Sequence, residues 1–248
     1  MGVGTQAVGL VFALGLALAS REPFPTPAGA AWSLIAGVAG VIGLLAFYRG
    51  LAVGAMSLVA PLAALIGAGL PVVAGYALGE RLAPGQGAGI VAALAAVAMV
   101  SRPAADGDEG RGGVGLAFLA GLGFAAFFVG MDRAIASGAG SWWPLPIARM
   151  ASVVLTSSAV AVSGRGRQLR GVVTPIVLMA GVADTAGNLG FLLARSQGPL
   201  GPAAVVASLY PAVTVVLAWI VLGERLGRVH LAGVVLAFAG IALIALPG

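Results

Sequence analysis

The pentapeptide Leu78-Gly79-Glu80-Arg81-Leu82 recurs unchanged at residues 222–226, and this repetition decides the fold. Each copy ends a long apolar run, and each is followed by a second apolar run that contains an Ala-Gly pair, at 88–89 and at 232–233. The same interval of 144 residues separates the two pentapeptides and the two Ala-Gly pairs. A constant interval means that a whole architectural unit is repeated, and such a repeat in an apolar chain is typical of a membrane protein with internal pseudo-symmetry.

The composition of the chain points to lipid as its main solvent. Of the 248 residues, 60% are hydrophobic and only 8% are charged, and the mean hydropathy is +1.08. A soluble domain carries about 25% charged residues, so a surface covered by water is excluded. The formal charge of +5 comes from arginines in short loops between apolar runs, where they set membrane topology, so we expect no nucleic-acid partner. Cysteine is absent, which excludes disulfides and thiolate metal sites, and we predict neither a metal ion nor a cofactor.

Nine apolar runs are long enough to cross a bilayer, because a helical span needs about 17–25 residues. The runs are continuously apolar, whereas the strands of a membrane β-barrel would alternate between apolar and polar residues. We therefore predict an all-α polytopic membrane protein with a multi-pass location in the plasma membrane, for a bacterium the inner membrane. The predicted spans cover residues 3–19, 30–51, 56–79, 86–101, 113–135, 142–163, 172–195, 201–222 and 229–246.

The two copies of the pentapeptide are predicted to face opposite sides of the membrane, because five spans, an odd number, lie between them. The duplication is thus inverted, with residues 1–103 as the first repeat and residues 112–248 as the second. A shift of 144 residues places spans seven, eight and nine on spans two, three and four, and places span six on span one. Span five then falls before Met1, so the first repeat lacks its first helix. Either the coding sequence begins upstream of Met1 or the protein has nine spans.

Several segments resemble EamA-type transporters of the drug/metabolite transporter superfamily. In the second half they are Ser208-Leu-Tyr-Pro211, the pentapeptide copy at 222–226, and the run from Ala232-Gly233 through Ala239-Gly240. The first half resembles the same repeat through Phe47-Tyr-Arg-Gly-Leu51 and Ala60-Pro61. The resemblance implies ten helices in two inverted repeats, a central cavity, and export or exchange of small metabolites. Family members usually have a cytoplasmic C-terminus. Arginine counts in the loops here instead favour a cytoplasmic N-terminus and an external C-terminus, so the orientation stays open.

One stripe of polar residues in span seven is the clearest candidate site. Asp184, Asn188, Phe191 and Arg195 follow at i, i+4, i+7 and i+11, which places them on one face of a helix. At about 1.5 Å per residue, Asp184 and Arg195 lie roughly 16 Å apart, too far to pair. Asp184 must therefore be neutral, hydrated in a cavity, or paired with another helix. Arg149 in span six is a candidate partner, a candidate ligand for an anionic substrate group, or a residue that extends to the interface. The stripe either lines a substrate cavity or forms a structural pair.

Further candidates follow from breaks and charges along the spans. Ser208, Tyr210 and Pro211 interrupt span eight, where proline frees a backbone carbonyl that can line a cavity or merely kinks the helix. Two further candidates for cavity residues are Ser57, near Pro61 and Pro71, and Tyr48. Arg49 and Arg195 are either gates or plain topogenic charges. The structural turns are predicted at Glu80, Arg81, Glu224 and Arg225, where each glutamate can reach the free N–H groups of the following helix. Asp132 and Arg133 are neighbours that do not face each other on a helix, which predicts a loop or interface role.

These observations predict a secondary transporter, not an enzyme, that moves a small organic solute by alternating access between inverted halves. The chain has no lysine for a Walker motif and no His-Glu or Ser-His arrangement for catalysis. The alternative is a truncated membrane scaffold or a subunit of a heteromer with the same fold, suggested by the missing helix. The expected partners are a small-molecule substrate and the lipid bilayer, and a homodimer stays open.

Overall fold

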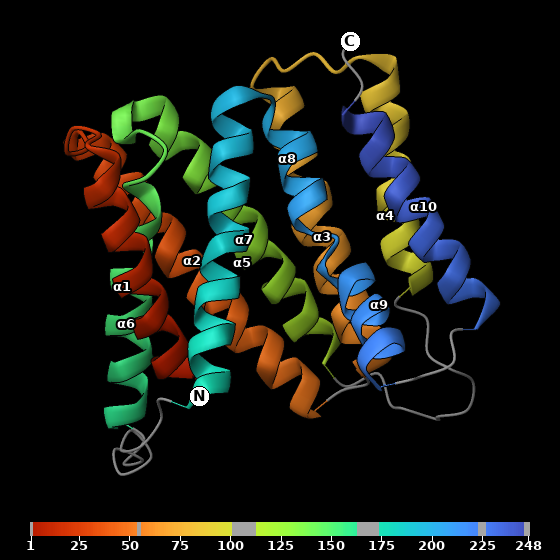
Figure 1. Ribbon diagram of the computed structural model, residues 1–248, viewed down its shortest axis with the longest axis horizontal. Helices are drawn as coiled ribbons and strands as arrows, with labels where there is room; N and C mark the ends of the chain where they lie inside the picture. The colour runs from red at the N-terminus through yellow and green to blue at the C-terminus, as the bar shows by residue number, and fades with distance from the viewer. Residues whose placement is uncertain (1, 54–55, 101–112, 163–173, 223–226, 246–248) are drawn as a thin grey trace. The chain divides into compact units, whose positions relative to one another are not determined.

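The computed structural model describes residues 2–53, 56–100, 113–162, 174–222 and 227–245 (Figure 1). Within these ranges the chain is helical with no β-strand, and seven helices are long and apolar enough to cross a membrane. Large apolar side chains are exposed along these helices, for example Val11 at 73% and Ile176 at 71%. A soluble protein rarely exposes apolar surface on this scale, so these side chains face lipid. The predicted all-α polytopic membrane fold is confirmed.

Each predicted span corresponds to one helix except the eighth, which is divided into α8 and α9, and several helices start where proline allows it. Proline occupies the first position of four helices, at residues Pro27, Pro84, Pro144 and Pro175. A backbone N–H at this position makes no hydrogen bond within the helix, so its absence in proline costs nothing, and the fixed φ angle of proline suits the helix. The helices are α1 (Gly2–Ser20), α2 (Pro27–Val53), α3 (Met56–Ala77), α4 (Pro84–Val100), α5 (Val114–Ala134), the π-helix η1 (Ile135–Ala139), α6 (Pro144–Val162), α7 (Pro175–Gln197), α8 (Leu200–Ala207), α9 (Tyr210–Leu222) and α10 (Arg228–Ala245).

The eighth span is broken, as its sequence predicts, whereas the third is not. At the end of α8 the backbone N–H of Ser208 faces the carbonyls of Ala204, Val205 and Val206, and Pro211 cannot donate the next hydrogen bond. Pro61 and Pro71 do not break the third span, because α3 runs without interruption from Met56 to Ala77. Proline in a membrane helix can be accommodated when neighbouring helices support the freed backbone groups.

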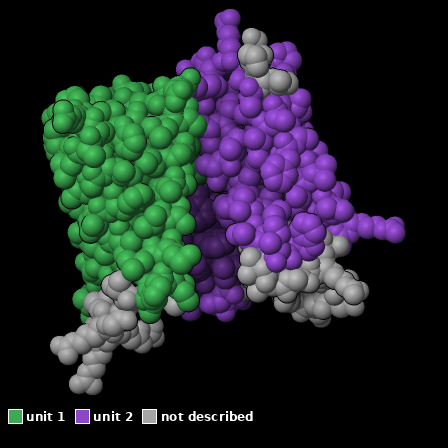
Figure 2. Space-filling model, in the orientation of Figure 1, with its two compact units in different colours: residues 1–41, 126–197 green, residues 42–125, 198–248 purple. Residues whose placement is uncertain are grey.

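The chain forms two compact units, coloured separately in Figure 2. Unit 1 comprises residues 1–41 and 126–197, and unit 2 comprises residues 42–125 and 198–248. Two of the three boundaries fall inside α2 and α5, so each of these helices contributes to both units, and the third falls between α7 and α8. The units therefore differ from the two repeats predicted from the sequence, since each unit combines segments from both halves of the chain.

In unit 2, α4 packs against α10 through contacts at matching positions of the two predicted repeats (Figure 1). A Cβ atom on Gly89 would lie 2.9 Å from the backbone nitrogen of Ile244, and a Cβ atom on Gly233 would lie 3.1 Å from the backbone nitrogen of Val100. Gly89 and Gly233 are 144 residues apart, and so are Val100 and Ile244. The two contacts are thus copies of each other, and only glycine allows the two backbones to approach so closely.

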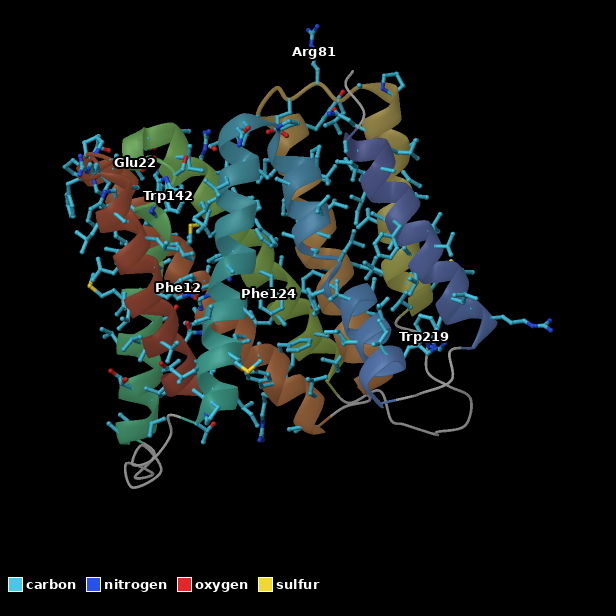
Figure 3. All side chains as sticks on the ribbon, viewed as in Figure 1. Phe12, Glu22, Arg81, Phe124, Trp142 and Trp219 are labelled. Atoms are coloured by element: carbon cyan, nitrogen blue, oxygen red, sulfur yellow. The ribbon has the colours of Figure 1, made fainter. Side chains whose placement is uncertain are left out.

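In unit 1, α1 lies against both α6 and α7 (Figure 1). The end of α1 is tied to the start of α6 by Glu22, whose carboxylate accepts hydrogen bonds from the backbone N–H groups of Ser141 at 3.0 Å and Trp142 at 3.1 Å. Figure 3 shows Glu22 and Trp142 together at this end of the unit. The indole of Trp143 also donates to the carbonyl oxygen of Glu22 at 3.2 Å and packs against the edge of Phe24. Negative charge at a helix N-terminus is stabilising, because it meets free N–H groups and the positive end of the helix dipole.

Glu80, the glutamate of the first pentapeptide, makes a similar contact in unit 2. Its carboxylate accepts hydrogen bonds from the N–H groups of Leu200 at 2.6 Å and Gly201 at 3.3 Å, at the start of α8. The sequence predicts that Glu80 reaches the helix that follows it, α4, but there Gln86 accepts the N–H of Ala83 instead. Arg81 is exposed and extends away from the helices (Figure 3), while Glu224 and Arg225 lie outside the described residues.

Candidate functional site

A charged pair in unit 1 joins α6 to α7. Arg149 is buried at 7% exposure, and its Nη2 donates to Asp184 Oδ2 at 2.5 Å. Its Nη1 donates to Gln6 Oε1 on α1 at 2.6 Å, and Gln6 is itself buried. Asp184 is different, because 56% of its side chain is exposed. Asn188, one helical turn further along α7, donates to Asp184 Oδ1 at 3.3 Å and to its backbone carbonyl at 2.9 Å.

The guanidinium of Arg149 retains one unused donor. Its Nε–H is buried and has no hydrogen-bond partner within the described ranges. An unpaired buried donor costs about 1–3 kcal/mol, so natural sites usually fill it with water or a ligand. Arg149 Nε lies beside Gly9 of α1. A Cβ atom added to Gly9 would be 3.4 Å from Arg149 Nε and 2.5 Å from the Thr185 hydroxyl oxygen. Glycine at position 9 therefore allows α1 to approach the guanidinium and the Thr185 hydroxyl closely.

The rest of the α7 stripe packs against α5, also within unit 1. The ring of Phe191, 3% exposed, lies with its centroid 4.7 Å from that of Phe128. One turn further along each helix, Arg195 Nε donates to Asp132 Oδ1. The stripe predicted to line a cavity is thus divided: Phe191 and Arg195 form an interhelical seam, whereas Asp184 and Asn188 keep an accessible polar surface.

Asp132 corrects an expectation from the sequence. Neighbouring residues on a helix are expected not to face each other, yet Arg133 Nε lies 3.2 Å from Asp132 Oδ2. The long arginine side chain folds back at the point where α5 gives way to the π-helix at Ile135. Asp132 is fully buried, at 1% exposure, and bonds to two arginines at the contact between α5 and α7, so of the two predicted roles it lies at an interface and not in a loop.

The structure brings together three of the predicted cavity residues in unit 1, and the other described cavity candidates belong to unit 2. Arg149, Asp184 and Asn188 are in contact in unit 1, whereas unit 2 holds the exposed Tyr48 and Arg49 on α2, the buried Ser208, and Tyr210, which is 43% exposed. The side chain of Ser57 lies outside the described part of the chain. An apolar pocket between α9 and α10 of unit 2 contains none of the polar candidates.

Sequence reasoning missed the roles of Gln6, Gly9 and Thr185. Gln6 carried a usable signal, since an uncharged polar residue four positions inside an apolar helix needs a hydrogen-bond partner. Thr185 is buried at 0% exposure and donates to the carbonyl oxygen of Gly181 at 2.7 Å. Its packing against Gly9 depends on the register of two helices, which no local pattern specifies.

The described geometry agrees with a comparison of the sequence with known families. The EamA-like transporter family matches residues 111–246, more than half of the chain. The chain belongs to the EamA-like transporter family. EamA proteins are membrane transporters of the drug/metabolite transporter superfamily, and the apolar helices agree with a multi-pass membrane location.

Structural comparison finds the same fold in a solved protein. A solved crystal structure superposes with a TM-score of 0.75, covering 99% of this chain and 87% of the other, at 18% sequence identity. At this identity the likeness shows the fold alone. No curated protein matches the sequence of the chain.

Proposed function

We propose that this EamA protein is a secondary transporter that moves a small organic metabolite by alternating access, with Arg149, Asp184 and Asn188 as its polar binding site. The observation that supports the proposal is the unequal burial of one ion pair. The guanidinium is 7% exposed and keeps an unused donor, whereas its carboxylate partner is 56% exposed. Charges within membrane helices are costly, so they mark substrate or ion pathways by default.

The arrangement can offer a substrate both signs of charge and several hydrogen bonds. Asp184 presents accessible carboxylate oxygens, and Asn188 on the next turn can adjust its amide to a ligand. Gln6 and Asp184 fix two of the three guanidinium nitrogens, so the group is held in place before a ligand arrives. Preorganised polar groups of this kind lower the ordering cost of binding.

The first experiment identifies a ligand. Purified protein is screened by thermal shift against amino acids, sugars and cationic dyes, and compounds that stabilise it are tested for uptake into proteoliposomes. We expect Asp184→Asn to abolish transport of the identified compound while the protein stays folded. Ser196→Ala serves as the control, because the hydroxyl of this exposed α7 residue bonds to its own helix, at Leu193. A folded protein that binds and transports none of the compounds would favour the scaffold alternative.

Coupling to protons through Asp184 is a separate proposal. It rests on the position of an accessible carboxylate about 13 Å from the start of α7, at ~1.5 Å per residue. Transport is measured in proteoliposomes with and without a pH gradient. An Asp184→Asn variant that keeps full gradient-driven transport would exclude this carboxylate as the coupling group.

A further inference from the structure

The ion cluster at Asp132 joins two helices in an asymmetric way. The carboxylate is 1% exposed and bonds to Arg133 through one oxygen and to Arg195 through the other. Arg133 belongs to α5, as Asp132 does, so the two residues move together. Arg195 belongs to α7 and lies two residues before the end of that helix at Gln197.

This asymmetry decides what happens when the end of α7 moves away from α5. A buried ion pair that loses one partner is normally very unfavourable, because the remaining charge is left buried without compensation. Asp132 escapes this penalty, since Arg133 stays beside it on the same helix. The Arg195–Asp132 pair is thus an interhelical contact that can break without leaving a buried carboxylate unpaired.

The neighbouring contact on the same two helices is apolar, a pair of aromatic rings. Phe128 and Asp132 are four residues apart on α5, and Phe191 and Arg195 are four residues apart on α7, so the ring pair and the ion pair lie one turn apart. The same face of α7 carries Asp184, eleven residues before Arg195. Movement of this helix would therefore move the polar site together with the latch formed by Arg195 and Asp132.

We propose that Asp132 and Arg133 are positioning residues of the transport cycle: Arg195 on Asp132 latches α7 to α5, and Arg133 is the standing counter-ion that makes this latch releasable. The inference rests on the proposed function, because it assigns the release of α7 to a step of transport. It does not require the identity of the substrate.

The test uses a single thiol placed beside the latch. The chain has no cysteine, so Leu192→Cys supplies one reactive site at a position that is 1% exposed and three residues before Arg195. The rate at which a membrane-permeant maleimide labels this thiol in proteoliposomes reports how often the buried face of α7 near Arg195 becomes accessible. In this background we expect Arg195→Gln to speed labelling, because the latch is lost. We expect Arg133→Gln to slow labelling by about tenfold or more, because opening of the latch in this variant leaves Asp132 buried without a counter-ion.

The sign of the Arg133 effect separates the proposal from a purely structural role. If Arg133 merely stabilised the fold, its loss would loosen the protein and labelling would be faster. Faster or unchanged labelling in Arg133→Gln therefore overturns the proposal, as does unchanged labelling in Arg195→Gln. Arg133→Lys keeps the charge and is expected to restore the background rate.

A transport measurement links the latch to function. With a substrate identified, Arg133→Gln is expected to lower the maximal rate of transport by a factor similar to the labelling effect, with little change in the substrate concentration for half-maximal rate. A normal maximal rate in this variant would refute the assignment to the transport cycle. If the unmodified protein transports nothing, the proposed function fails, while the labelling rates still decide whether the latch exists.

Discussion

Substituting Gly9 by alanine tests whether the close approach of α1 holds the polar site together. The added Cβ would lie 2.5 Å from the Thr185 hydroxyl, about 0.9 Å inside the 3.4 Å at which ordinary contact begins. Thr185 cannot yield easily, because it is fully buried and its hydroxyl donates to the carbonyl of Gly181. Either the two helices separate by close to 1 Å or Thr185 gives up its hydrogen bond.

Both responses cost a similar amount. Overpacking a well-packed interior costs about 1–3 kcal/mol, and leaving a buried hydroxyl unpaired costs about the same. For a chain of this size, each kcal/mol lowers the unfolding temperature by roughly 2–4 °C, so Gly9→Ala is expected to lower it by roughly 2–12 °C. Separation of the helices would also lengthen the 2.6 Å hydrogen bond from Arg149 to Gln6, and without separation the new methyl group would lie 3.4 Å from Arg149 Nε.

The assay compares thermal unfolding in detergent, with and without an identified ligand, for Gly9→Ala and Gly15→Ala. Gly15 is on the same helix, and a methyl group added there would meet no atom within 4 Å, so its substitution should be neutral or stabilising by up to about 1 kcal/mol. Gly9→Ala should lose both stability and the ligand-induced rise in unfolding temperature. Equal unfolding temperatures for the two variants would refute the argument that Gly9 is required by helix packing.

Two further predictions concern the helix contacts. Gly89→Ala should destabilise the protein by about 1–3 kcal/mol, because the added Cβ would meet backbone atoms of α10. Gly87→Ala on the same helix has open space around the added Cβ and should not destabilise it. Similar unfolding temperatures for both variants would contradict the argument that α4 and α10 need glycine at position 89. Glu22→Gln should cost about 0.5–2 kcal/mol through loss of the charged cap, with faster amide hydrogen exchange at Ser141 and Trp142; unchanged exchange at these amides would show that the cap contributes nothing.

The helices could be predicted from the sequence because lipid imposes a simple rule on each segment separately. Every span must be apolar over about 20 residues, and proline marks several starts. The division into two compact units could not be predicted in this way, since it cuts α2 and α5 at points where the sequence has no break.

The polar site was predictable where its contacts are local. The spacing of Asp184 and Asn188 places them on one face, and they do bond to each other. The partner of Asp184 stayed open, because Arg149 comes from another helix and its depth depends on packing. The expectation that Asp132 and Arg133 do not face each other was wrong for a different reason. The rule for adjacent helical residues concerns the direction of Cβ atoms, and a long guanidinium at an irregular helix end can turn back to its neighbour.

The role of Glu80 shows how an inverted repeat makes a turn residue act at long range. A shift of 144 residues places Leu200, where α8 begins, on Met56, where α3 begins, so α8 is the counterpart of the start of α3. Inverted helices that pack side by side bring the end of one next to the start of the other. A glutamate that follows the end of α3 therefore meets the free N–H groups of α8, about 120 residues away. Glu22 likewise follows the end of α1 and accepts hydrogen bonds from N–H groups at the start of α6. In both helix pairs, α3 with α8 and α1 with α6, a carboxylate that local sequence rules assign only to a turn therefore joins two helix ends.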